Sequence, residues 1–218
     1  MLEGNGGNDA IDGGAGNDTI DGGEGTDTAV YQFAPAAVSV TLNEGDSLGT
    51  ASDGNGGTDS LIDLENIIAS ELDDNLTGNS GDNSFTGRDG NDTIEGLAGD
   101  DFLTGGNGAD SLTGGEGSDQ FVYLDAEEGG DTITDFAVGT DKIAAVASGF
   151  SDGLSAGELP ESSFVIGSAA TGSEQRFVFN DASGELLFDA DGLGAASQQL
   201  IATLDGVSNL SAGDILLL

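Results

Sequence analysis

Residues 105–113 read Gly-Gly-Asn-Gly-Ala-Asp-Ser-Leu-Thr, and residues 13–21 read Gly-Gly-Ala-Gly-Asn-Asp-Thr-Ile-Asp. Both stretches fit one nine-residue pattern, Gly-Gly-x-Gly-x-Asp-x-U-x, in which U is apolar. Glycine permits tight turns, aspartate supplies an oxygen ligand, and an apolar residue between polar neighbours predicts a strand with one buried face. A unit of this kind stacks on its neighbours to bury that face, so its repetition predicts a calcium-loaded solenoid.

The pattern forms two arrays. The first array, residues 1–30, holds three repeats that start at Gly4, Gly13 and Gly22. The second array, residues 69–122, holds six frames, which start at Ala69, Gly78, Gly87, Gly96, Gly105 and Gly114. The first of these frames lacks the glycines, as is typical of a terminal repeat that caps a solenoid.

Residues 31–68 interrupt the period and are predicted to form a β insert. One isolated repeat lies inside this insert at residues 54–62, and it starts 50 residues after Gly4. Because 50 is not a multiple of nine, the register has slipped. Alternation at residues 38–42 predicts a half-exposed strand, and residues 64–68 fit a strand or a short helix, of which we favour the strand.

Residues 123–218 carry no repeats and are predicted to form a β-rich capping flank. Residues 131–136 and 199–204 each predict a strand, and residues 176–188 predict a hairpin. The sequence ends with the apolar residues Ile215–Leu218 behind Asp214. The N-terminus lacks the basic and apolar regions of an export signal peptide, and we expect the sequence to be the C-terminal part of a longer protein.

Composition excludes several classes of function. The chain of 218 residues has 41 acidic and 3 basic residues, a net charge of −38. With so little positive surface, nucleic acid is not expected as a partner, and no apolar run is long enough for stable membrane insertion. Histidine is absent, which removes the commonest general base and the usual catalytic triads. We therefore predict a monomeric protein that is not an enzyme. The absence of cysteine is compatible with a secreted protein stabilised by metal.

The spacing of the aspartates explains why calcium is expected. Two nonapeptides, each read as a six-residue turn and a three-residue strand, would complete one coil of 18 residues, so that acids 18 apart would stack on one edge. Two carboxylates about 4 Å apart repel by roughly 4 kcal/mol at an effective dielectric of about 20, and a divalent cation between them reverses the sign. The stacked pairs are Asp9 with Asp27, Asp74 with Asp92, Asp92 with Asp110, Asn83 with Asp101, and Asp101 with Asp119. The full set of predicted side-chain ligands is Asp9, Asp18, Asp27, Asp59, Asp74, Asn83, Asp92, Asp101, Asp110 and Asp119.

Energetics indicate that the metal is needed for folding. Each repeat buries one apolar side chain such as Ile94, worth roughly 1.5–3 kcal/mol. Ordering the backbone costs roughly 1–2 kcal/mol for each of its nine residues. Hydrogen bonding and packing recover part of this deficit, and the remainder predicts a metal-free chain without the solenoid, in which metal binding is also folding.

These phased repeats resemble the RTX (repeats-in-toxin) family of haemolysin-type calcium-binding proteins. The resemblance implies an all-β fold, a right-handed parallel β-roll with calcium-filled turns, and about five or more calcium ions. It also implies that turn carbonyls complete each site. Those carbonyls belong to Gly4, Gly6, Gly13, Ala15, Gly22, Glu24, Gly87, Asp89, Gly96, Ala98, Gly105, Asn107, Gly114 and Glu116. Two departures weaken the pattern, namely Asn83 in place of an aspartate and the missing glycines before Asp74.

The resemblance further implies a role outside the cell. Members of the family leave bacteria unfolded through type I secretion machinery and fold in external calcium, and residues 214–218 resemble the terminal secretion motif. We thus expect a secreted module whose weak calcium affinity keeps it unfolded inside the cell. Two alternatives remain open: a calcium-dependent polysaccharide or surface-binding module, and a fragment of an exoenzyme or adhesin whose active part lies upstream.

Several other features have simpler interpretations. Asp135 and Asp141 are candidates for further calcium sites in the flank, although acids in surface turns explain them as well. A disordered glycine-rich linker is disfavoured by the fixed phase of aspartate and apolar residue. An ice-binding threonine row is disfavoured because only Thr26 and Thr58 occupy fifth positions.

Overall fold

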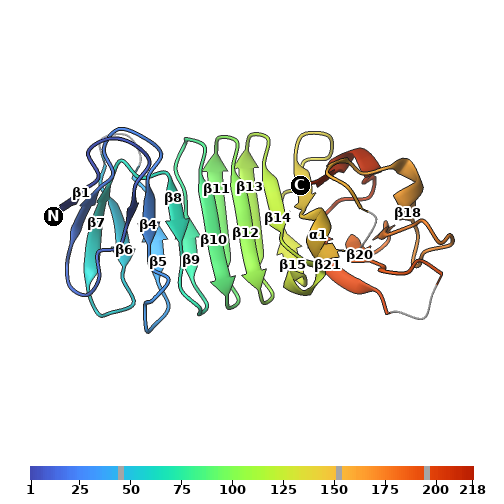
Figure 1. Ribbon diagram of the computed structural model, residues 1–218, viewed down its shortest axis with the longest axis horizontal. Coiled ribbons are helices and arrows are strands. Elements are labelled where there is room, and N and C mark those ends of the chain that lie inside the picture. Colours follow the sequence, from blue (N-terminus) through green and yellow to red (C-terminus); the bar gives the residue numbers. More distant parts are fainter. Residues whose placement is uncertain (44–46, 151–153, 194–196) are drawn as a thin grey trace.

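The computed structural model describes residues 1–43, 47–150, 154–193 and 197–218. Two β-sheets face each other along a single long stack, and the N-terminal coils lie at the end opposite the C-terminal flank (Figure 1). The described residues also form one four-residue helix, α1 (Ala147–Phe150), and three 3-10 turns, at Ala126–Glu128, Glu161–Ser163 and Ala212–Asp214. No helix within the described ranges has the length and apolar character needed to cross a membrane.

Outside the insert and the flank, the strands alternate between the two sheets as the chain advances. In spatial order, the 13-stranded sheet contains β1 (Leu2–Glu3), β3 (Thr19–Asp21), β7 (Thr58–Ile62), β6 (Gly49–Ser52), β5 (Ser39–Thr41), β9 (Asn75–Thr77), β11 (Thr93–Ala98), β13 (Ser111–Glu116), β15 (Asp131–Ile133), β21 (Gln199–Leu204), β20 (Glu185–Phe188), β19 (Phe177–Asn180) and β18 (Phe164–Ile166). The 9-stranded sheet contains β17 (Gly157–Glu158), β22 (Ile215–Leu217), β16 (Lys142–Ala145), β14 (Gln120–Tyr123), β12 (Phe102–Asn107), β10 (Ser84–Asp89), β8 (Asn66–Ile68), β4 (Thr28–Val30) and β2 (Ala10–Ile11).

The second array has the register that its repeat predicts. Strand β10 pairs in parallel with β12 so that Phe85 lies opposite Leu103, and β11 pairs with β13 so that Ile94 lies opposite Leu112. Both pairs are 18 residues apart, which confirms two nonapeptides per coil. The all-β solenoid expected from the sequence is therefore present.

The prediction of three-residue strands is confirmed for β9 but is wrong for the four strands that follow it in this array. Strands β10 to β13 each run for six residues, because the ladder continues through the first glycines of the next repeat. In these four strands the second position of the next frame lies in the left-handed region, with φ of 103° at Gly106 but also 89° at Arg88 and 83° at Leu97. Glycine fits this position without strain, whereas arginine and leucine occupy it at a conformational cost.

The eighth positions of the repeats form the core. On the 9-stranded sheet, Ile67, Phe85, Leu103 and Phe121 are fully buried. Their counterparts across the roll, such as Ile94, are equally buried. Their neighbours in the strands alternate outward, so one apolar side chain from each repeat fills the space between the sheets.

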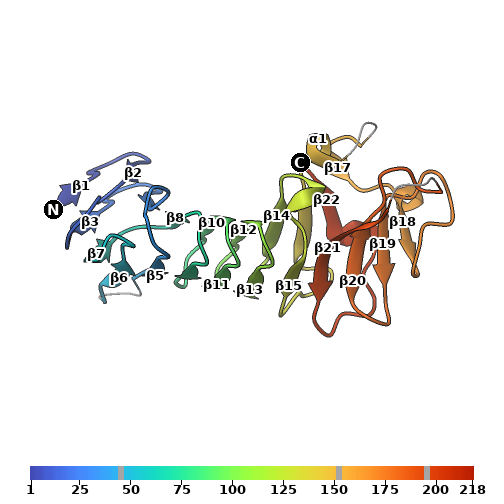
Figure 2. The same cartoon turned by 90° about the horizontal axis from the view of Figure 1, so that it is seen from below.

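The insert continues the roll on one side and widens it on the other. In the 9-stranded sheet, β4, β8 and β10 are direct neighbours, whereas the 13-stranded sheet places β6 and β5 between β7 and β9. Strand β6 is antiparallel to both β5 and β7. Two additional strands add about 10 Å to one sheet at a spacing of about 4.8 Å per strand. The sheets cannot stay aligned across this step, and Figure 2 shows the N-terminal coils turned out of line with the second array.

The flank closes the open end of the roll. Strands β15 and β16 extend the two sheets, and β21 and β22 pair with them in parallel. The predicted hairpin is confirmed as the antiparallel pair of β19 and β20, and the predicted strand at Gln199–Leu204 is confirmed as β21. Beside this hairpin, the ring centroids of Phe150 and Phe188 lie 5.0 Å apart. The flank therefore has an aromatic core of its own.

Two phenylalanines on adjacent strands, one buried and one exposed, test whether the eighth positions form the stabilising core. Phe85 in β10 is 0% exposed, whereas Phe102 in β12 is 44% exposed on the outer face. We expect Phe85→Ala to lower the free energy of unfolding in saturating calcium by about 3–5 kcal/mol, because it leaves a cavity in the core. Phe102→Ala serves as the matched control and should change it by less than about 1 kcal/mol. Urea unfolding followed by circular dichroism measures both, and equal effects would contradict the assignment of the core.

Candidate calcium centre

Acidic side chains form two columns along the edges of the roll. Each member lies at the beginning of a strand, where the chain enters a sheet. The first column follows the 13-stranded sheet and contains Asp18, Asp59, Asp74, Asp92, Asp110 and Asp131. The second column follows the 9-stranded sheet and contains Asp9, Asp27, Glu65, Asn83, Asp101, Asp119 and Asp141.

One oxygen of each column acid holds the preceding coil. The backbone N–H of Asp92 donates to Oδ1 of Asp110 at 2.7 Å, and that of Asp101 donates to Oδ1 of Asp119 at 3.0 Å. The same bond recurs along both columns, joining Asp9 to Asp27, Asp18 to Asp59, Asp27 to Glu65, Asp74 to Asp92, Asn83 to Asp101, Asp110 to Asp131, and Asp119 to Asp141. The structure thus brings together all five pairs expected from the 18-residue spacing.

The second carboxylate oxygen of most column acids has no partner. Within the described residues, the buried Oδ2 atoms that lack a hydrogen bond include those of Asp9, Asp27, Asp92, Asp101, Asp110, Asp119 and Asp131. An ionised oxygen that is removed from water without a partner is strongly disfavoured. A repeated row of such oxygens therefore indicates a ligand that is itself positively charged.

Beside the open oxygens of Asp92 and Asp101, the space is lined by a carbonyl of the next coil and leaves room for no side chain larger than that of glycine. A Cβ atom added to Gly87 would overlap Oδ2 of Asp92 and lie 2.6 Å from the carbonyl oxygen of Gly105 in the next coil. At Gly96 the same position meets Oδ2 of Asp101 and lies 2.7 Å from the carbonyl oxygen of Gly114. Carboxylate and carbonyl oxygens in loose geometry are the ligands that calcium prefers, so the residues present fit this ion.

The carbonyl groups predicted as calcium ligands divide into two groups by their position in the nonapeptide. Those at first positions, such as Gly105 and Gly114, lie beside the open carboxylate oxygens of the preceding coil. Those at third positions take part in the ladder, since the carbonyls of Glu24, Asn107 and Glu116 accept the N–H groups of Gly7, Gly90 and Gly99. A carbonyl oxygen has a second lone pair, so these hydrogen bonds leave it able to bind a metal.

At one coil, hydrogen bonds occupy the side-chain oxygens that are open elsewhere in the two columns. The residues concerned are Asp74 in the first column and Asn83 in the second. Oδ1 of Asp74 accepts the N–H of Val38 at 2.7 Å, and Oδ2 accepts the N–H of Ser70 at 2.7 Å. In the second column, the Asn83 side chain accepts the N–H of Asn79 at 3.0 Å and donates to the carbonyl of Glu65 at 2.9 Å. Both residues were predicted as ligands, and the structure satisfies both without a cation.

The two acids proposed for the flank are also satisfied. The carboxylate of Asp135 accepts the N–H groups of Gly114 and Gly115 at 3.0 and 2.8 Å, so it caps a turn of the roll. The carboxylate of Asp141 accepts those of Asp119 and Ala137 at 3.1 and 2.7 Å. In neither residue is an oxygen left open in the way that it is at Asp92.

Sequence reasoning missed Asp131 and Glu65, which the structure places in the columns. Glu65 has no glycine directly before it, and the Gly129-Gly130 pair directly before Asp131 does not fit the nonapeptide frame. The signal that identifies them is the short Asp/Glu-x-U pattern, present as Asp131-Thr132-Ile133 and Glu65-Asn66-Ile67. A further buried acid with an open oxygen, Asp53, lies outside the repeat frame.

Burial changes the protonation of the column acids. It raises the pKa of Asp92 and of Asp101 to about 7, and the charge of the next column acid adds to the effect in each case. Burial likewise raises the pKa of Asp131 to about 8 and those of Asp110 and Asp119 to about 6. Without metal, the folded roll therefore favours protonated carboxyl groups.

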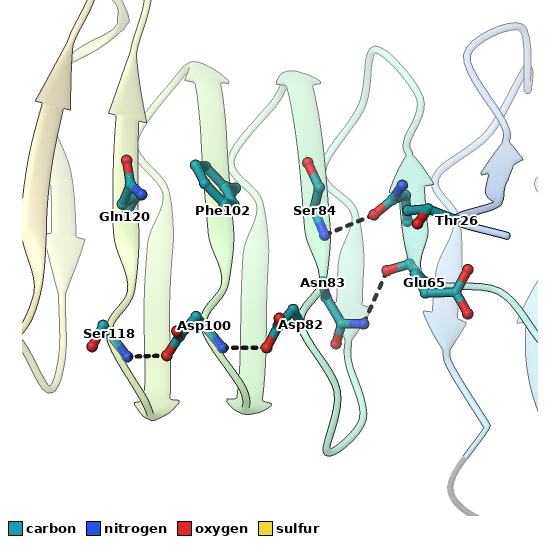
Figure 3. Close-up of a pocket in the computed structure, with 10 residues that line it drawn as sticks. Thr26, Glu65, Asp82, Asn83, Ser84, Asp100, Phe102, Ser118 and Gln120 are labelled. Carbon is teal, nitrogen blue, oxygen red and sulfur yellow. Dashed lines mark hydrogen bonds between the residues drawn. The ribbon is translucent and has the colours of Figure 1, made fainter. Parts of the chain in front are cut away.

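A shallow groove of about 770 Å³ crosses the outer side of the second column (Figure 3). One wall is a row of fifth-position side chains, in which Oδ1 of Asp82 accepts the N–H of Asp100 and Oδ1 of Asp100 accepts that of Ser118, both at 2.8 Å. The floor carries the exposed ring of Phe102 and the amide of Gln120. This polar groove with one aromatic ring is separate from the open oxygens of the columns.

Comparison with known proteins identifies the repeats. The family model of the RTX calcium-binding nonapeptide repeat matches in four copies, over residues 1–29, 68–103 and 86–121. Comparison with curated proteins finds no match to this chain.

Three solved structures are similar to it. The AlgE6R3 subunit of the Azotobacter vinelandii mannuronan C5-epimerase is 30% identical, with 67% of this chain and 78% of that chain covered and a TM-score of 0.47. The AlgE6R2 subunit of the same epimerase is 26% identical, with 70% and 92% covered and a TM-score of 0.45. The extracellular lipase LipA from Serratia marcescens is 19% identical, with 97% of this chain but 38% of the lipase covered and a TM-score of 0.38.

The phased repeats, the two columns and the family match agree. The chain belongs to the family of proteins built on RTX calcium-binding nonapeptide repeats. Repeats of this family bind calcium, and in this chain they form a parallel β-roll with oxygen-lined turns.

The raised pKa values predict an inverted pH dependence for the metal-free chain. An aspartate titrates near 3.9 when unfolded, and Asp92 and Asp101 titrate near 7 when folded. Their contribution to stability is therefore complete below about pH 4 and is lost as the pH rises through about 7. In chelator, far-UV circular dichroism should report more β structure at pH 5 than at pH 8. In saturating calcium the loss of β structure at pH 8 should disappear. A metal-free circular dichroism signal that does not vary with pH would contradict the raised pKa values of Asp92 and Asp101.

Asn83 allows a gain-of-site test. Its Oδ1 lies beside Gly78 and the carbonyl of Gly96, as Oδ2 of Asp92 lies beside Gly87 and the carbonyl of Gly105. We expect Asn83→Asp to bind one more calcium ion per chain, because it adds the missing charge to an existing oxygen set. Equilibrium dialysis with labelled calcium measures the count. The control is Asn91→Asp, which makes the same charge change at an exposed fifth position on the other edge of the roll. An unchanged count in Asn83→Asp would contradict the assignment.

Proposed function

We propose that this protein is a calcium-dependent folding module, in which the β-roll forms as calcium fills the two columns. The observation that carries the proposal is the row of buried carboxylate oxygens without partners, as at Asp92 and Asp101. In a roll without ions, each of these two oxygens lies beside a turn carbonyl oxygen, which also carries partial negative charge. Calcium removes that repulsion and links adjacent coils.

The overall charge supports the same proposal. The net charge is −38, and the only ion pair among the described residues joins Arg88 to Glu71. Self-repulsion on this scale opposes a compact state. Bound divalent cations are the simplest source of neutralisation, so the metal-free chain is expected to be expanded and to lose the roll.

We propose that folding occurs outside the producing cell. An affinity in the weak extracellular range, about 10⁻⁴–10⁻³ M, would leave the chain unfolded in a cytosol that is poor in calcium and fold it after export. The apolar residues near the C-terminus support this order of events, because Ile215 and Leu217 are buried between β16 and β17. Type I secretion machinery that reads these side chains would have to do so before the flank folds. In this proposal the chain has no catalytic role.

A calcium titration tests the folding switch. Far-UV circular dichroism should change from coil to β at sub-millimolar to millimolar calcium, and magnesium should fail to replace it because it requires tighter octahedral geometry. We expect Asp101→Asn to move the midpoint several-fold toward higher calcium, since it removes the charge of one open oxygen. Asp181→Asn makes the same charge change in an exposed hairpin turn and should leave the midpoint unchanged. A chain that is fully folded in chelator, or equal midpoints for the two variants, would contradict the proposal.

The groove of Figure 3 favours a second candidate, calcium-dependent binding of a polysaccharide. Its exposed Phe102 ring and its amides, Asn66 and Gln120, are groups that pack on and hydrogen-bond to sugars. The two epimerase subunits similar to this chain come from an enzyme that is named for a polysaccharide. Co-sedimentation with insoluble polysaccharides, with and without calcium, tests this candidate. Retention that requires calcium and is lost in Phe102→Ala would support it.

A further inference from the structure

Asp53 is a buried acid outside the nonapeptide frame. It lies directly before Gly54, the first residue of the isolated repeat, and it is 0% exposed. Its Oδ1 accepts the N–H groups of Asn55 and Gly57, both at 2.8 Å. Its Oδ2 has no hydrogen-bond partner. One oxygen thus shapes the hairpin turn between β6 and β7, and the other is left open, as in the columns.

Oxygen atoms from three separate segments surround this carboxylate. A cavity of about 190 Å³ is lined by Asp53, by the ring of Tyr31 and by Asp12 at its exposed rim. The Tyr31 hydroxyl donates to Oδ2 of Asp59 at 3.3 Å, and Asp59 is fully buried. A Cβ atom added to Gly57 would lie 2.7 Å from Oδ2 of Asp53 and would overlap the carbonyl oxygen of Gly16. Carboxylate, carbonyl and hydroxyl oxygens therefore meet where the hairpin contacts the first array.

No basic side chain neutralises this cluster. The chain has three basic residues. Arg88 pairs with Glu71, Lys142 donates to the carbonyl of Gly213, and Arg176 donates to that of Ser173. Two buried carboxylates without a cation are strongly disfavoured. A set made only of oxygens, without nitrogen or sulfur, favours a hard cation such as calcium.

We propose that Asp53, which lies outside the repeat register, and the column acid Asp59 bind a calcium ion at this junction, with the Gly16 carbonyl and the Tyr31 hydroxyl as further oxygen ligands. No three acidic side chains converge on a single point within the described ranges. The junction site therefore uses two carboxylates and neutral oxygens, as the sites along the columns do. The ion would link the β6–β7 turn to the Gly16 turn of the first array, in addition to the pairing of β3 with β7.

Terbium luminescence tests the junction site, because Tyr31 is one of two tyrosines and the chain has no tryptophan. Terbium replaces calcium and emits when a nearby tyrosine is excited. Tyr123 lies near Asp131 of the first column, so the measurement uses a Tyr123→Phe parent in which Tyr31 is the remaining sensitiser. We expect this parent to emit on excitation of tyrosine and calcium to suppress the emission.

The decisive variants are Asp53→Asn and Asp53→Ser in that parent. Both retain an acceptor for the turn N–H groups and remove the open carboxylate oxygen. We expect either variant that folds to lose most of the emission and one calcium ion per chain in equilibrium dialysis. Asp205→Asn, an acid in an exposed turn, is the matched control and should keep both. A silent parent, or Asp53 variants that keep both the emission and the calcium count, would overturn the proposal.

This inference goes beyond the proposed folding switch, and the two fail separately. If the chain is already folded in chelator, the folding switch fails, while terbium and dialysis still report the junction site. If Asp53→Asn keeps its calcium count while the circular dichroism transition remains dependent on calcium, the junction site fails and the folding switch stands.

Discussion

The structure depends on how each column acid divides its two oxygens between different tasks. One oxygen accepts the backbone N–H of the preceding coil, as Asp110 does from Asp92, and fixes the distance between coils. The other points at a glycine and a carbonyl of the next coil and has no partner of its own. An amide would hold the coil without attracting a cation, and an apolar residue would do neither. Aspartate at the sixth position therefore joins two coils and at the same time offers an oxygen to a cation.

Glycine is required at the first position of the repeat because the open carboxylate oxygen lies against it. At Gly87 and Gly96 the volume that a methyl group would occupy is already taken by the carboxylate oxygen and the facing carbonyl. The insert follows a different principle, since β5 and β6 widen one sheet while the other sheet continues unbroken. The roll is thus regular where aspartate and glycine recur in the nonapeptide frame. Its direction changes where β5 and β6 are inserted into the 13-stranded sheet alone.

The periodic parts of the structure were predictable and the interruptions were not. The fixed phase placed Ile94 in the core and Asp92 beside Asp110, because each coil repeats the same local rules. The neighbours of Asp18 and Asp27 were not predictable, because the hairpin decides which coil comes next, 41 and 38 residues further on. Closure of Asp74 by Ser70 depends on the shape of one loop that has no glycine. Asp53 was missed because nothing in its sequence neighbourhood distinguishes it from a turn acid.

The coil that carries Asp74 and Asn83 has a consequence for communication along the molecule. A stack whose units contact only their neighbours behaves as a one-dimensional chain, in which order spreads through nearest-neighbour coupling. Most other coils have an open carboxylate oxygen beside a neighbouring coil, whereas at this coil a serine, an amide and backbone groups satisfy the side-chain oxygens. If calcium joins the other coils, as proposed above, this coil separates two cooperative blocks. Loss of ions from the N-terminal coils would then leave the longer block beside the flank loaded and folded.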